Sequence, residues 1–68
     1  MDLETKVEVA VEILNTLIAR ESMIDASEKN ENLANLLFTR AQVMNLDEEV
    51  TEQVIRDFGP IIKSEVKK

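Results

Sequence analysis

The stretch from Leu3 to Ile24 constrains this chain most, because it contains neither glycine nor proline. Its apolar residues recur at alternating spacings of four and three, and only Glu21 interrupts the series. Such spacing places one face of a helix against a partner. It predicts a long helix over about residues 3–28. The seam consists of Leu3, Val7, Ala10, Leu14, Leu17 and Ile24.

This helix carries more apolar surface than one seam requires. Val11 and Ile18 widen the seam on one side, so that the apolar arc covers half the circumference or more. An ordinary surface helix has a stripe of about 100°. A second copy of the chain is the expected cover, although the later helices of the same chain are the alternative. A second seam results from Val9, Ile13, Leu17 and Ile24.

The chain is short, with 68 residues that we assign to a single domain, 1–68. A domain of this size buries only about 60% of its unfolded surface and is marginally stable alone. The sequence has no Cys for a disulfide or a thiolate zinc site, and no His for a transition metal. Self-association remains as the means of stabilisation, and we expect a homodimer.

Asp25 to Asn32 is a polar interruption that holds no apolar position to bury. We expect a turn between two antiparallel helices here, with Asn30, Asn32 or Ser27 as the cap of the second helix. Because the segment lacks glycine and proline, one continuous helix is the alternative. The second helix is predicted over about 31–45, with an inward face that Ala34, Phe38 and Ala41 extend. The face itself comprises Leu33, Leu36, Leu37, Arg40 and Met44.

A third helix is predicted over about 46–58, with Asn45 and Glu48 forming a capping box. Gly59 and Pro60 are expected to end it, since glycine suits the residue after a helix and proline cannot continue the ladder. A short helical turn over 60–66 follows, where Ile61 and Ile62 extend the expected dimer interface. The fold class is therefore all-α: a long N-terminal helix in a helical hairpin, a third helix and a C-terminal turn, completed by dimerisation.

The net charge of −6 disfavours direct binding to nucleic acid or to an anionic membrane surface. No helix shows the Lys/Arg-rich outer face of a helix-turn-helix reader. No apolar run approaches the roughly 18 residues of a membrane helix, and no secretory signal is seen. We expect a cytoplasmic protein.

Catalytic motifs are not found. Without His or Cys the usual nucleophile–base pairs cannot be built, and a single glycine excludes phosphate-binding loops. Two acidic pairs, Glu8/Glu12 and Glu48/Glu52, have the spacing to share Mg²⁺, but a solvated acidic face is the favoured interpretation. We expect no enzymatic activity, no cofactor and no metal.

Arg40 is the one charge between Asn32 and Leu46. It is interpreted either as an anchor for an acidic partner or, preferably, as an ion-pair partner of a carboxylate such as Glu21. Glu21 itself either tunes the specificity of the seam or marks its exposed end.

The leading hypothesis is a non-enzymatic, acidic protein–protein interaction module that dimerises and acts as a regulator or inhibitor by docking on a protein. The alternative is an acidic mimic of nucleic acid that inhibits a nuclease or another DNA-binding enzyme. The overall pattern is similar to that of many short helical proteins of bacterial genomes, without a motif that identifies a family. The predicted oligomer interface comprises Val9, Ile13, Leu17, Ile24, Ile61 and Ile62, and the predicted partner contacts are Arg40, Glu48, Glu49 and Glu52.

Overall fold

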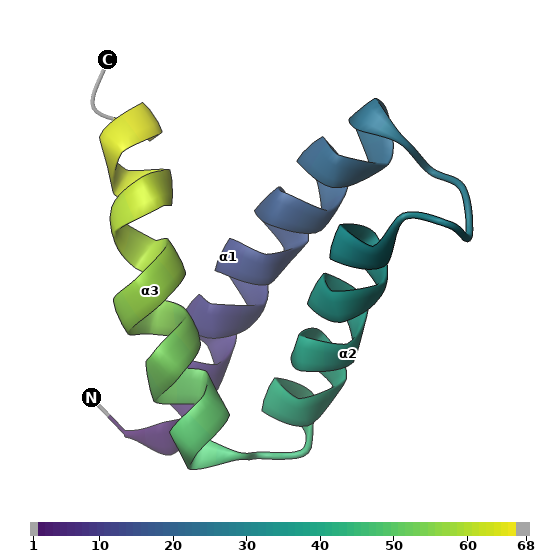
Figure 1. Cartoon of the computed structure of the whole chain (residues 1–68). Coiled ribbons are helices and arrows are strands. Elements are labelled where there is room, and N and C mark those ends of the chain that lie inside the picture. The colour runs from purple at the N-terminus through teal and green to yellow at the C-terminus, as the bar shows by residue number, and fades with distance from the viewer. Residues whose placement is uncertain (1, 67–68) are drawn as a thin grey trace.

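The computed structural model describes the backbone of residues 2–66 and the side chains of residues 2–61. It contains three helices, α1 (Leu3–Ile24), α2 (Glu31–Met44) and α3 (Glu48–Val66), and the described part has no strand (Figure 1). The predicted all-α class is confirmed.

The helices form a single layer. Helix α1 packs against both α2 and α3, whereas α2 and α3 contact each other far less. The principal extents of 35 × 32 × 14 Å give a flat molecule. In Figure 1, α2 and α3 approach each other at the turn that joins them and diverge toward the opposite end. We call these the closed end and the open end.

The core lies toward the closed end, where all three helices contribute. Thr51 is also fully buried there, and its hydroxyl donates to the carbonyl of Asp47 at 2.7 Å. The five buried apolar residues are Ala10, Ile13, Leu14, Val43 and Val54.

Helix α2 is rotated relative to the predicted inward face. Val43 is fully buried, whereas Leu37 and Met44 are 40% and 58% exposed. The prediction for these residues was wrong because α2 packs on the core through Leu36 and Val43, two positions seven residues apart on one helical face.

The first two helices begin at side-chain caps, and Asn30 is one of the three residues predicted as the cap of the second helix. Asp2 accepts a hydrogen bond from the Thr5 amide at 2.8 Å, and Asn30 accepts one from the Leu33 amide at 3.1 Å. The buried Asn30 also donates from Nδ2 to the carbonyl of Asp25 at 2.6 Å, which ties the start of α2 to the end of α1. Helix α1 ends at Ile24, earlier than the predicted 28.

Asp25 begins the turn after α1 by accepting a hydrogen bond from the Ser27 amide at 2.9 Å. Backbone hydrogen bonds lower the pKa of both exposed aspartates, from the Thr5 amide for Asp2 and from the Ser27 amide for Asp25. Each carboxylate is thus favoured in its charged form.

The turn between α2 and α3 corrects the predicted capping box. Asn45 is the C-cap of α2, and Leu46 follows in the left-handed region with φ 64°. The Leu46 amide donates to Val43 at 3.0 Å and the Asp47 amide to Gln42 at 3.3 Å, which is a Schellman arrangement. A left-handed Leu46 cannot begin a helix, so α3 begins only at Glu48 instead of the predicted 46.

Asp47 replaces Asn45 as the cap of α3. Its Oδ1 accepts a hydrogen bond from the Val50 amide at 3.2 Å. The side chain that sequence reasoning chose for this role lies two residues too early because it belongs to the end of α2.

Helix α3 continues through Gly59 and Pro60, contrary to the predicted stop. Gly59 does not have the positive φ that terminates a helix. It also lacks the Cβ that ordinarily clashes with the ring of a following proline, so the helical conformation before Pro60 is accessible. Pro60 has no amide proton, so the helix loses one hydrogen bond and goes on to Val66.

Candidate docking groove

A groove of about 480 Å³ opens at the open end, between α2 and α3 and over the C-terminal part of α1. Each of the three helices contributes apolar side chains to it. Its apolar lining is Leu17, Ile24, Leu36, Phe58 and Ile61.

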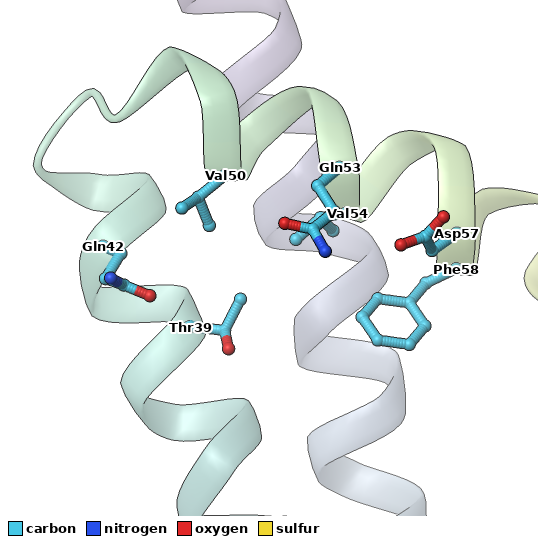
Figure 2. A pocket seen from close by; sticks show the side chains of 7 residues that line it. All are labelled: Thr39, Gln42, Val50, Gln53, Val54, Asp57 and Phe58. Atoms are coloured by element: carbon cyan, nitrogen blue, oxygen red, sulfur yellow. The ribbon is translucent and has the colours of Figure 1, made fainter.

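A smaller hollow of about 190 Å³ continues this groove toward the closed end. Figure 2 shows its two sides, with Thr39 and Gln42 on α2 and the remaining labelled residues, Val50 among them, on α3. Thr39 and Phe58 line both hollows, which makes the groove continuous along the gap between α2 and α3.

The continuation of α3 builds the groove wall. Phe58 is half-buried and packs against the core, and Ile61 follows one helical turn later on the same face. Ile61 is 48% exposed and Ile24, across the groove on α1, is 77% exposed. Both side chains retain apolar surface that the chain itself does not cover.

Polar side chains accompany this apolar lining. Arg20 and Glu21 contribute from α1, and Asn35 and Thr39 contribute from α2. Glu21, the residue that interrupts the seam of α1, is half-buried in this lining. The groove therefore offers an apolar floor together with a few polar groups, which is typical of recognition sites.

The structure gathers half of the predicted oligomer interface into this groove. Leu17, Ile24 and Ile61 line it together. Ile13 is only 8% exposed, because α3 covers it and its Cδ1 lies beside Gly59. Val9 is half-buried against the core, and the side chain of Ile62 lies outside the described residues.

For Ile13, then, the later part of the same chain provides the cover, which was the alternative to a second copy. The surplus apolar surface of α1 lies at its C-terminal end, at Leu17 and Ile24, and not along its whole length.

Arg40 is used within the chain. Its Nη1 donates to Oδ1 of Asn15 on α1 at 2.8 Å, in place of the predicted ion pair with Glu21. This contact fastens α2 to α1.

Of the three acidic residues predicted to contact a partner, one is paired within the chain and two are exposed. Glu52 forms an ion pair with Lys6 of α1 at 3.1 Å, so it also fastens two helices together. Glu48 and Glu49 are exposed in the first turn of α3. Among the described residues, no group of acidic side chains is arranged to hold a metal ion. Within the described range, no helix has the length and hydrophobicity to span a membrane.

Sequence reasoning missed one surface, on the outer side of α2. Five of its side chains are exposed and none is charged; we call them the outer stripe. The 3–4–3 spacing of four of them was available in the sequence, but these residues were assigned to the inward face. The outer stripe consists of Ala34, Leu37, Phe38, Ala41 and Met44.

The comparisons with known proteins add no family to this geometry. No family model matches the chain, and neither a curated protein nor a solved structure gives a match.

Proposed function

We propose that this protein is a non-enzymatic, homodimeric interaction module that regulates or inhibits a partner protein by binding one of its amphipathic helices. The docking site is the groove between α2 and α3 at the open end. The observation that carries the proposal is the exposure of Ile24 on its α1 floor and of Ile61 on its α3 wall, at 77% and 48%.

The shape of the groove suits a helix. Two helices form its walls and α1 forms its floor, so a fourth helix laid between the walls would complete a four-helix arrangement. Helices recognised in this way place apolar anchors at i, i+3 or i+4, and i+7 into the groove. Phe58 and Ile61 on the α3 wall and Leu17 and Ile24 on the α1 floor supply apolar contacts at helical spacing.

A second copy is a poor occupant of the groove. Two concave grooves placed face to face do not fill each other. The exposed apolar ridge among the described residues is the outer stripe, and a stripe-into-groove contact is heterologous, so it would propagate into chains instead of closing a dimer. A helix of another protein fills the groove without this difficulty.

Met23 and Ile24 provide a matched pair of variants to test this proposal. Both are exposed, at 88% and 77%, and they are neighbours near the end of α1, but only Ile24 lines the groove. Proteins are captured from the native cell with the wild-type chain, Met23→Asp and Ile24→Asp. We expect wild type and Met23→Asp to retain the same partner and Ile24→Asp to lose it.

A synthetic peptide covering an amphipathic helix of the captured partner is then titrated into ¹⁵N-labelled protein. The expected result is saturable binding with amide shifts at Leu17, Leu36 and Phe58, weakened by Ile24→Asp and not by Met23→Asp. Equal binding to both variants would overturn the groove as the docking site. Conversion of a wild-type dimer to a monomer by Ile24→Asp, measured by light scattering, would assign the groove to a second copy instead.

A further inference from the structure

We infer that the outer stripe of α2 is the surface through which two copies of this chain pair, with their α2 helices antiparallel. This inference rests on the homodimeric part of the proposed function and supplies an interface for it. It replaces the predicted interface on α1, where Ile13 is buried and Leu17 and Ile24 belong to the groove.

The outer stripe is a continuous apolar surface that the chain leaves uncovered. Phe38 is 66% exposed, Met44 58% and Leu37 40%. At about 100° per residue, the stripe faces away from Asn35 and Thr39, two of the groove-lining residues of α2. A contact at the stripe therefore leaves the groove open.

The charge distribution favours a second copy at this surface. Each chain carries a net charge of −6, so two copies repel each other over most approaches. Helix α2 has no Asp or Glu between Asn32 and Leu46, and its one charge in that range, Arg40, is held by Asn15. Two acidic molecules therefore meet no carboxylate-to-carboxylate repulsion along residues 33–45 when their α2 helices face each other.

The order of small and large side chains fits antiparallel pairing. Ala34 and Ala41 occupy one heptad position, and Leu37 and Met44 occupy the next core position. In an antiparallel pair these two kinds of position face each other, so Leu37 meets Ala41 of the second copy and Ala34 meets Met44 of the second copy. Every layer then combines a small with a large residue, which fills the interface evenly.

A parallel pair would place alanine on alanine and large residues on one another, leaving gaps in some layers and crowding others. The antiparallel pair has its two-fold axis at the level of Thr39, so that Phe38 meets its own symmetry mate and adds an aromatic contact. The result is a closed dimer that carries two grooves directed away from the interface.

The absence of Cys from the chain makes disulfide cross-linking a direct test of this register. Leu37→Cys and Ala41→Cys are prepared separately and oxidised alone or mixed. Positions 37 and 41 of opposite chains lie face to face, whereas 41 and 41 are separated by about 6 Å along the axis. We expect the mixed disulfide to form about tenfold faster than either homodimeric disulfide, because disulfides require close Cα atoms.

A charge at the stripe tests the interface independently. Ala41→Glu and the control Ala19→Glu make the same change at exposed alanines within helices, but Ala19 lies on α1. Circular dichroism is expected to show that both variants fold. Sedimentation is expected to give an apparent dissociation constant raised about 100-fold for Ala41→Glu and unchanged for Ala19→Glu, since two carboxylates would be buried without partners.

The outcomes separate this inference from the proposed function. A wild-type dimer that Ala41→Glu leaves intact, or preferential 37–37 cross-linking, would overturn the inference and leave the homodimer standing. A wild-type monomer at micromolar concentration would overturn both the inference and the homodimeric part of the proposal. Docking in the groove is measured separately, by the response of the helical peptide to Ile24→Asp.

Discussion

The two ends of this molecule use the same kinds of apolar side chain in opposite ways. At the closed end, Leu14, Val43 and Val54 come from three helices and are at most 2% exposed. At the open end, Ile24 and Ile61 line one groove and remain 77% and 48% exposed. The residues are equally hydrophobic, so hydrophobicity does not account for the difference.

The number of helices that converge at each end accounts for it. At the closed end the turn at 45–47 holds α2 and α3 together over α1. At the open end α2 and α3 diverge, and α1 alone cannot cover both. Apolar surface at the closed end therefore contributes to the stability of the fold, whereas apolar surface at the open end is available to a partner.

The largest expected effect contrasts truncations at the two ends. Leu14→Ala should lower the free energy of unfolding by about 2–5 kcal/mol, because it leaves a cavity where the three helices meet. Ile24→Ala should change it by less than about 0.5 kcal/mol, since the side chain is already exposed. Urea unfolding followed by circular dichroism measures both. Equal losses would mean that the open end also carries the core.

Pro60→Ala tests whether the hydrogen bond missing at Pro60 limits the stability of α3 at the open end. The substitution restores the hydrogen bond to Arg56 and removes a ring clash, together worth up to about 3 kcal/mol in a helix interior. Amide exchange in the last turns of α3 should slow by up to about 100-fold. Gln53→Ala, at an exposed position nearer the closed end, is the control and should leave exchange there unchanged. Unchanged exchange in Pro60→Ala would contradict this account of α3.

Asn30→Ala tests how much the cap of α2, which also links α2 to the end of α1, contributes to stability at the open end. It removes the hydrogen bonds to the Leu33 amide and the Asp25 carbonyl, and it should cost about 1–2 kcal/mol of unfolding free energy. Asn32→Ala is a matched control because Asn32 is exposed in the first turn of the same helix. Equal thermal stability of the two variants would argue against a stabilising role for the Asn30 hydrogen bonds between α1 and α2.

Leu46→Gly tests whether backbone strain in the turn between α2 and α3 lowers stability at the closed end. Leu46 is held at φ 64°, where an L-residue is strained and glycine is not. The free energy of unfolding of Leu46→Gly should therefore be about 1 kcal/mol higher than that of wild type. Leu46→Ala retains the Cβ and should stay within about 0.5 kcal/mol of wild type. A gain in both variants would place the effect in the exposed side chain and not in the backbone.

The smallest effect is expected in acid. Asp2 and Asp25 have pKa values below the ordinary 3.8, so their contribution is present above that value and is lost as the pH falls through the lowered pKa of the folded state. Both are exposed, so the change is small. Thermal melts between about pH 5 and about pH 2 should show a shallower decline for Asp2→Asn and Asp25→Asn than for wild type. Melts identical to wild type would mean that neither Asp2 nor Asp25 contributes to the loss of stability in acid.

Local features of this fold were predictable from the sequence. The helical period of α1 and the cap at Asn30 depend on neighbours within one or two turns, and the structure confirms them. The predicted stop at Gly59–Pro60 failed because that signal requires a left-handed glycine, and nothing local decides between that conformation and a helix that accepts one missing hydrogen bond.

The groove was only half predictable, because it depends on how helices diverge. Leu17, Ile24 and Ile61 were expected to be apolar and uncovered, but no pattern indicated that they line one groove. Leu36 was expected on the inward face of the second helix, and its partial burial follows from the angle between α2 and α3. The rotation that buries Val43 in place of Met44 likewise depends on where α1 lies.

Helix α1 packs against both other helices, while these contact each other far less. A substitution on the buried face of α1 therefore loosens the packing of both neighbouring helices at once. A screen that scores only loss of activity would select variants that unfold the protein together with variants that lose a binding contact. It would not distinguish the two kinds of variant. For this protein a measure of foldedness has to accompany every functional assay before any residue of α1 is credited with contact.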